Sequence, residues 1–436
     1  MIVPPPSYSL ARPQSLLLPL LWVVMGSALI FESDAYRYAT ILLVALSIWQ
    51  FKDLHRLLMR DWLAWLCWAW GGYVLIRFAI GIVVHDEKGT SEWLYAFPLL
   101  FPALGVALYA MREHLFAAVT ALIAAAAAGL LLTNDVMTLM SGGRTYPLFH
   151  NNPIHAAVAC GMLMVICIFW TLYIIESGRI RQRQGSLLLA LGVATVVLCL
   201  IGVFGARSKG VWLALVPTAA LIAVAVTIYL SGKLRLAIIG IIAILSVVAG
   251  YAGADRVLRV AGPTIQATSE LSEQRSADGL IRAMQKAVND RDTPHSMRER
   301  LELWLNSVHV IKNSPWFGSG NEWLREWRMG PYPDVRYNIL HNGYLEIMVR
   351  HGLVGLAVLA AFTAASAYRI HQAMQQGYLL RSAGLGIICV SSFFFVTLAT
   401  NSNNRLAIGE SFFLVVAAAT FAVSLSMRVN DSSGTQ

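Results

Sequence analysis

Residues 153–175, PIHAAVACGMLMVICIFWTLYII, form an apolar run that contains no Asp, Glu, Lys or Arg. A helix needs about 20 such residues to cross the hydrocarbon core of a membrane. Inside a bilayer the backbone must satisfy its own hydrogen bonds, which favours a helix over an irregular segment. The stretch therefore predicts a transmembrane helix.

The composition of the whole chain agrees with this prediction. Of the 436 residues, 57% are hydrophobic and 13% are charged, whereas soluble domains carry roughly 45–50% apolar and about 25% charged residues. These values exclude an ordinary soluble enzyme, and the abundance of apolar residues excludes a disordered chain. We expect an all-α polytopic membrane protein.

Twelve segments have the length and composition of transmembrane helices. They are residues 15–31, 36–51, 62–84, 93–111, 115–133, 153–175, 186–204, 211–230, 236–253, 352–368, 383–400 and 408–427. Lys and Arg favour cytoplasmic loops. Short loops on one face, including the N-terminal segment, hold thirteen of these cations, and those on the other face hold six. This asymmetry predicts that both termini are cytoplasmic.

The predicted domain organisation follows from the spans. Residues 1–253 contain the first nine helices, residues 254–340 form a loop subdomain on the outer side, residues 341–428 contain the last three helices, and residues 429–436 form a cytoplasmic tail. Apolar residues at helical spacing predict helices over 277–288 and 296–312 of the loop. Ser296 and Glu299 have the spacing of a capping box at the start of the second helix.

The formal net charge of +9 does not indicate a nucleic-acid partner. The cations are scattered between apolar segments, whereas nucleic-acid binding needs them gathered in one patch. All five cysteines lie inside predicted spans, so no disulfide is expected.

Polar residues gather at the outer ends of the spans, where each is costly and is a functional candidate. His341 lies just before a span, and a neutral imidazole accepts a proton from a hydroxyl; a solvated or capping histidine is the alternative. Glu346 and Arg350 stand four residues apart, a spacing that suits a structural ion pair.

Arg207 and Lys209 occupy a short turn, where they either bind an anionic group or extend into lipid headgroups. Arg300 lies at the edge of the apolar face of its helix.

The order of three motifs is similar to a known family. ARSKGVWLAL (206–215) opens one span, SMRERLELWLNSVHVIKNSPWFGSGNEW (296–323) lies in the long loop, and HNGYLEIMVRHGLVGL (341–356) enters the next span. This pattern resembles the Wzy_C superfamily of O-antigen ligases, O-antigen polymerases and protein O-oligosaccharyltransferases. The matching loop positions are Ser296, Arg300, Trp304, Pro315, Gly318 and Gly320. Many members have Ser-Arg-Gly in the turn, whereas this chain has Arg207 followed by Ser208 and Lys209.

The resemblance implies a GT-C type glycosyltransferase of the bacterial inner membrane with a site facing the periplasm. An O-antigen ligase transfers a glycan from undecaprenyl diphosphate to lipid A–core oligosaccharide. His341 is then the general base, and Arg207 and Arg300 bind the diphosphate. Inversion in a single displacement, without a metal or another cofactor, is expected; the oligomeric state is left open. We expect further substrate contacts from Lys209, Asn342, Tyr344, Arg144, His150 and Asn152.

Two alternatives remain at this point. A polymerase or a protein O-oligosaccharyltransferase of the same superfamily would use the same donor with another acceptor. A secondary transporter or lipid flippase also has many spans, but transporters place their sites near the midplane between repeated halves. This chain has no internal repeat, and its polar residues lie at one face.

Overall fold

The computed structural model describes residues 12–89, 91–229, 279–336 and 339–433, with a few single positions between 230 and 278. This part of the chain forms α-helices that are joined by turns and short 3-10 helices. The α-helices are α1 (Arg12–Gly26), α2 (Ala35–Gln50), α3 (Lys52–Leu58), α4 (Trp62–Val83), α5 (Phe101–Ala110), α6 (Leu115–Thr133), α7 (Val136–Met140), α8 (Pro153–Glu176), α9 (Gly185–Ala206), α10 (Lys209–Tyr229), α12 (Leu280–Asn289), α13 (His295–Asn313), α14 (Trp323–Arg328), α15 (Gly343–Gln375), α16 (Arg381–Leu398) and α17 (Ala407–Ser433).

Nine helical segments of the described residues are long and apolar enough to cross a membrane, and the 3-10 helix η2 (Glu92–Leu100) joins α5 in one of them. The prediction of an all-α polytopic membrane protein is therefore confirmed. The predicted spans 15–31 and 36–51 correspond to α1 and α2, which have 15 and 16 residues and are shorter than the nine candidate membrane helices. The predicted span 236–253 lies outside the described residues, apart from positions 239 and 240.

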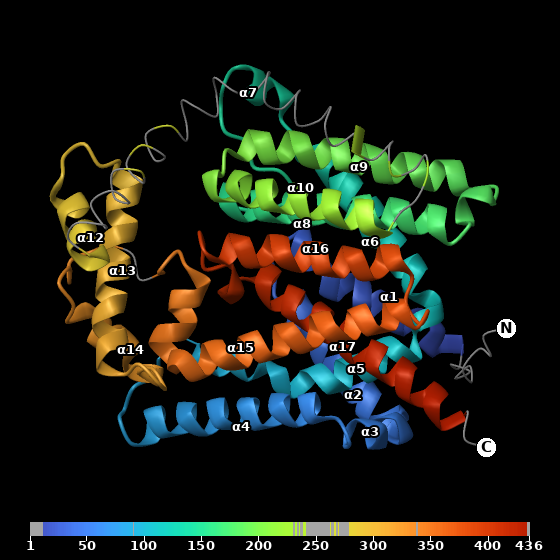
Figure 1. The fold of residues 1–436 in the computed structure, drawn as a ribbon, viewed down its shortest axis with the longest axis horizontal. Coiled ribbons are helices and arrows are strands. Elements are labelled where there is room, and N and C mark those ends of the chain that lie inside the picture. Colours follow the sequence, from blue (N-terminus) through green and yellow to red (C-terminus); the bar gives the residue numbers. More distant parts are fainter. Residues whose placement is uncertain are drawn as a thin grey trace.

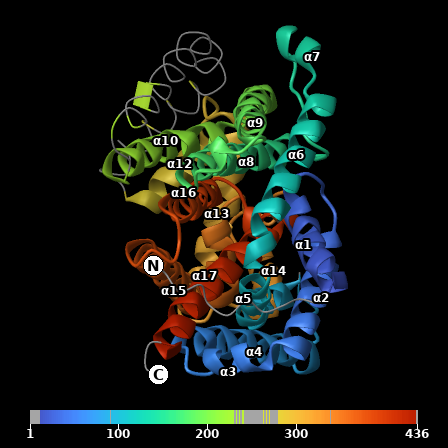
Figure 2. The same ribbon diagram turned by 90° about the vertical axis from the view of Figure 1, so that its right-hand side faces the viewer.

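The helices pack around two large apolar clusters. One cluster contains buried residues of α6, α8, α9, α10 and α16, among them Leu163 and Phe394. The other contains buried residues of α1 to α5, among them Leu43 and Leu104. Helices α15 and α17 contribute to both clusters and lie between the two groups of helices that form them (Figure 2).

Helices α12, α13 and α14 lie together at one end of the bundle, and α1 begins and α17 ends at the opposite end (Figure 1). The predicted helices 277–288 and 296–312 correspond to α12 and α13. The capping box was wrong: α13 begins at His295 and has Pro294 at its N-cap without a side-chain hydrogen bond. Starting one residue early puts the Ser296 side chain inside the first turn, where it cannot act as the cap.

A kink in α15 docks this group of helices onto the bundle. Gly352 has φ 62°, which only glycine adopts readily and which interrupts the helical hydrogen bonds. The freed amides of Leu353 and Val354 donate to the carbonyl oxygens of Pro315 and Trp316, at 2.9 and 3.0 Å. A side chain on Gly352 would clash with Trp316. Gly318 of the loop motif makes a similar contact, since a side chain there would clash with the backbone of Arg350 and His351. Pro315 and Gly318 therefore belong to a close backbone contact between the loop and α15.

Candidate functional site

His341 lies at the junction between the α13–α14 segment and α15. The residue before it is held on both sides: the amide of Leu340 donates to Glu346 Oε1 at 2.9 Å, and its carbonyl oxygen accepts from Trp304 Nε1 at 3.0 Å. His341 itself has φ 49°, an uncommon backbone conformation for a residue with a side chain. Such conformations persist where the surroundings enforce them, and they concentrate at functional sites.

The imidazole of His341 is half-buried beside the turn that precedes α17. Its Nδ1 lies 3.2 Å from Oδ1 of Asn401. Burial lowers the pKa of His341, and the nearby Arg300 guanidinium lowers it further, while the contact with Asn401 and the carboxylates of Glu346 and Glu299 oppose this. The net shift keeps the ring neutral at pH 7, the state in which it can accept a proton.

Arg300 reaches this histidine because of its place on α13. It lies one turn before Trp304, whose indole is bound to the Leu340 carbonyl oxygen. Arg300 is close enough to interact electrostatically with both His341 and Lys209. Lys209 begins α10, and a side chain on the next residue, Gly210, would clash with Thr400. The start of α10 therefore packs against the turn that carries Asn401.

Arg207, at the α9–α10 turn, and Arg144, between α7 and α8, are two further cations that lie next to each other. Arg207 is the C-cap of α9 in a left-handed conformation, φ 53°, and its guanidinium donates to the Gly142 carbonyl oxygen. Arg144 Nε donates to the carbonyl oxygen of Ala206 at 2.8 Å. Burial lowers the pKa of Arg144, and repulsion from Arg207 lowers it further. Arg144 and Arg207 thus lie close together, and Arg207 is two residues along the chain from Lys209.

A buried ion network lies beneath His341. Arg350 forms ion pairs with Glu346 and, at 3.2 Å, with Glu92 at the start of η2. Its guanidinium also lies 4.0 Å from the centre of the Trp323 ring. Glu346 further accepts from Ser402 Oγ at 3.0 Å and lies 3.6 Å from Arg405. The network connects η2, α14, α15 and the turn before α17.

Two of the residues proposed from sequence as substrate contacts stabilise helices in the structure. Asn342 Oδ1 accepts from the amides of Tyr344 and Leu345 and so caps α15, and Asn152 caps α8 in the same way. The Tyr344 hydroxyl donates to the Phe395 carbonyl oxygen at 2.8 Å. His150 is buried, with Nε2 3.2 Å from the carbonyl oxygen of Leu29.

A polar cavity of about 420 Å³ borders the site on the side of Arg405. Its lining includes Glu32, Asp34, Arg37 and His155, so that it carries both acidic and basic groups. Glu32 also lies 3.6 Å from His150, which brings that predicted residue to the edge of the cavity and away from the contacts of His341.

Sequence reasoning missed Glu92, Asn401 and Ser402. The run TNSNNR at 400–405 was visible as a polar stretch, but nothing in it specified contact with a histidine 60 positions earlier. Glu92 had one signal, because it is an acidic residue directly before an apolar segment. Its partner Arg350 is distant in sequence, so only the fold reveals the pair.

Residues 194–360 match the sequence model of the Wzy_C family, which is described as O-antigen ligase. This range contains Arg207, Lys209, Arg300 and His341. An uncharacterized protein of Haemophilus influenzae is 35% identical over 78 residues, which cover 16% of this chain and 19% of the relative. That alignment thus spans about a fifth of the relative's length.

Proposed function

The chain carries a Wzy_C domain in a multi-pass membrane protein, and from this premise we propose that it is an O-antigen ligase. It transfers O-antigen polysaccharide from undecaprenyl diphosphate to lipid A–core oligosaccharide. The observation that carries the proposal is the gathering of His341, Arg300 and Lys209 at one end of the bundle. A neutral base beside fixed cations suits attack on a diphosphate-linked sugar.

The cations act on the donor. In the transfer, the bond between the anomeric carbon and the diphosphate oxygen breaks, and negative charge develops on the departing diphosphate. Arg300, Arg207 and Lys209 stabilise this charge, and arginine also suits paired contacts to phosphate oxygens. A diphosphate is a good leaving group, so the reaction needs no general acid on this side.

His341 acts on the acceptor. The acceptor hydroxyl attacks the anomeric carbon from the face opposite the diphosphate and forms the new glycosidic bond. Its proton passes to the imidazole, for which general base catalysis is typical. A single displacement inverts the anomeric centre.

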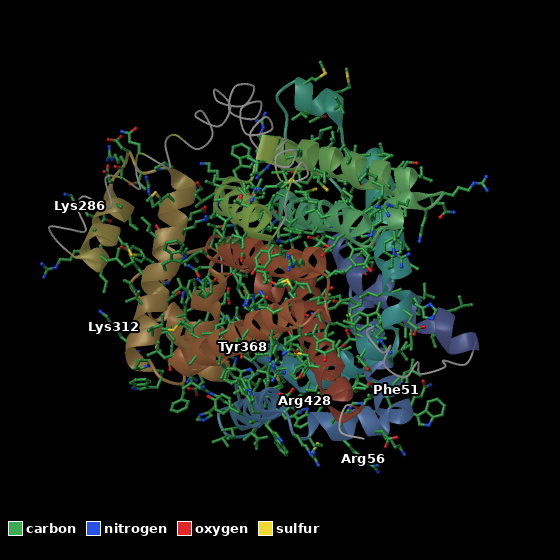
Figure 3. All side chains as sticks on the ribbon, turned by 45° about the vertical axis from the view of Figure 1, so that its right-hand side comes forward. Phe51, Arg56, Lys286, Lys312, Tyr368 and Arg428 are labelled. Atoms are coloured by element: carbon green, nitrogen blue, oxygen red, sulfur yellow. The ribbon has the colours of Figure 1, made fainter. Side chains whose placement is uncertain are left out.

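We also propose that the site faces the periplasm and that both termini are cytoplasmic. The charge count of the loops supports this orientation. Arg56 and Arg428, which that count assigns to the cytoplasmic side, lie far from Lys286 and Lys312 on the α12–α13 segment (Figure 3). In this orientation residues 254–340 form the periplasmic subdomain, between membrane helices in residues 1–253 and 341–428.

Arg300→Ala lowers kcat/KM for the donor about 10- to 100-fold, the effect of losing a hydrogen bond to a charged group. Initial rates over a range of donor concentrations measure the change, and Arg300→Lys recovers part of the loss. Arg298→Ala is the matched control, since Arg298 is a neighbouring cation on α13 whose guanidinium donates to the backbone at residues 290–293. An equal loss in both variants would contradict a specific role for Arg300.

The pH dependence of transfer reports the state of His341. Because burial lowers the pKa of His341, the activity falls on the acid side with a midpoint below the ordinary histidine value of 6.5 and is flat above pH 7. Arg300→Ala removes a cation that lowers this pKa, so the midpoint moves to higher pH. A profile of kcat/KM from pH 5 to 9 measures both values. A midpoint above pH 6.5 in the unmodified protein would contradict the prediction.

The acceptor decides between ligase, polymerase and protein O-oligosaccharyltransferase. Purified protein in lipid nanodiscs receives undecaprenyl-diphosphate glycan and a metal chelator, with lipid A–core, a second lipid-linked glycan or a peptide as acceptor. Gel electrophoresis then resolves the products. Product with lipid A–core supports the ligase, whereas product with only one of the other acceptors assigns that activity instead. No product with any acceptor would reject the proposal.

A further inference from the structure

A chain of hydrogen bonds leads from His341 into the protein interior. The Thr397 hydroxyl donates to the Phe394 carbonyl oxygen at 2.7 Å. The same hydroxyl oxygen accepts from Asn403 Nδ2 at 3.1 Å, and Asn403 Oδ1 accepts from Asn401 Nδ2 at 2.7 Å. Asn401 Oδ1 then lies 3.2 Å from Nδ1 of His341. Thr397, Asn401 and Asn403 are all buried.

The donor and the acceptor in each of these hydrogen bonds follow from the bond at the inner end, between Thr397 and Phe394. A backbone carbonyl oxygen only accepts, so the Thr397 hydroxyl proton is used there and its oxygen must accept from Asn403. Asn403 then presents its own oxygen to Asn401, which must donate through its amide nitrogen. Turning the Asn401 amide around would bring two carbonyl oxygens together in a buried site, which is unfavourable. These hydrogen bonds therefore set the orientation of the Asn401 and Asn403 amides.

We propose that Thr397, Asn403 and Asn401 form a relay that holds the proton of neutral His341 on Nδ1. Since Asn401 presents an oxygen, only an Nδ1–H can pair with it. The lone pair is then on Nε2, and Nε2 is the atom that takes the proton from the acceptor hydroxyl. Asn401 is a positioning residue that acts through His341. This inference rests on the proposed function in assigning Nε2 as the base; the tautomer itself does not depend on it.

The tautomer is measured by NMR on protein labelled with ¹⁵N-histidine in nanodiscs, because the two ring nitrogens of a neutral imidazole differ in chemical shift. The signal of His341 is identified by its loss in His341→Gln. We expect the Nδ1–H form in the unmodified protein and a mixture of tautomers in Asn401→Ala. Asn401→Asp keeps an acceptor oxygen opposite Nδ1; its second oxygen replaces the Asn401 amide group, so the Asn403 amide rotates to donate to it, and the Nδ1–H form is retained. Thr397→Val, which breaks only the inner end, shifts the mixture in the same direction by less.

Transfer assays complete the test. Asn401→Ala lowers kcat about 10- to 100-fold with little change in KM, the scale of loss known for removing the partner that orients a metal-bound histidine, and Asn401→Asp recovers most of it. Asn404→Ala is the matched control, since Asn404 lies in the same turn but its amide donates to the Tyr95 hydroxyl, at 3.2 Å. We expect this variant to keep both the tautomer and kcat.

The outcomes separate the inference from the proposed function. An unmodified protein that transfers glycan, combined with unchanged tautomer and kcat in Asn401→Ala, overturns the relay and leaves the ligase proposal standing. An Nδ1–H tautomer that is lost in Asn401→Ala, in a protein that transfers nothing to any acceptor, upholds the relay and rejects the ligase. An Nε2–H form in the unmodified protein overturns the relay directly.

Discussion

Replacement of His341 by alanine lowers kcat of glycan transfer by about 10²- to 10⁴-fold, the usual contribution of a general base. The imidazole of His341 is neutral at pH 7, lies near Arg300 and contacts Asn401. Without it, the acceptor hydroxyl has to lose its proton to water. Binding of the donor changes little, because the cations of the site remain. Single-turnover rates with saturating donor and acceptor measure the loss, and donor binding is measured separately.

His295→Ala is the matched control for this variant. His295 lies at the start of α13, with a side chain that is 80% exposed and a loose contact to Glu299 at 3.5 Å. Its removal leaves the rate unchanged. Unimpaired transfer by the His341 variant would overturn the assignment of the base, even if the protein is a ligase.

The second large effect is on stability: Arg350→Leu lowers the free energy of unfolding by about 3–5 kcal/mol, the usual cost of breaking a buried pair. The substitution leaves the carboxylates of Glu346 and Glu92 buried without their shared cation. A second substitution, Glu346→Gln, removes one of these charges and recovers part of the loss. Arg350→Leu also frees the Glu346 carboxylate, which accepts from the amide of Leu340 next to His341. We therefore expect glycan transfer to fall as well in Arg350→Leu.

The buried cysteines provide the measurement. All five, Cys67, Cys160, Cys167, Cys199 and Cys389, are free and buried, so a thiol-reactive dye labels them only as the protein unfolds. The midpoint of dye labelling on heating falls by several degrees in Arg350→Leu. Arg56→Leu is the control, because Arg56 and Asp53 form an ion pair with side chains 81% and 86% exposed. Such surface pairs contribute about 0–1 kcal/mol. Equal shifts in both variants would contradict the special role of the buried network.

Much of the fold was predictable because apolar runs respond to one dominant force. Segments such as 153–175 contain so few polar groups that only a membrane accommodates them, and α8 follows that prediction closely. The first span was harder, because α1 ends at Gly26 whereas its apolar stretch continues to residue 31; α2 agrees with its predicted span to within one residue. Helix ends depend on local turns, and hydropathy averaged over a window does not detect them.

The candidate site was predictable in part. His341 and Lys209 stood out as polar residues at the ends of apolar segments, and Arg300 stood out at the edge of the apolar face of a loop helix. The structure brings these three together. Tyr344 and His150 stood out for the same reason, but in the structure they bind backbone carbonyl oxygens of neighbouring segments. A polar residue near a membrane has to be satisfied in some way, and a single sequence does not reveal whether a substrate or a backbone group does so.

The membrane character of this protein, most of its helices and the residue types of its candidate site could be predicted from the sequence. Those properties arise from composition and spacing within a few helical turns. Three contacts were revealed by the fold alone: Asn401 faces His341, Glu92 shares Arg350 with Glu346, and the kink at Gly352 opens α15 to the Pro315–Trp316 backbone. These contacts join residues tens to hundreds of positions apart. Their geometry depends on how whole helices pack, and no local pattern encodes it.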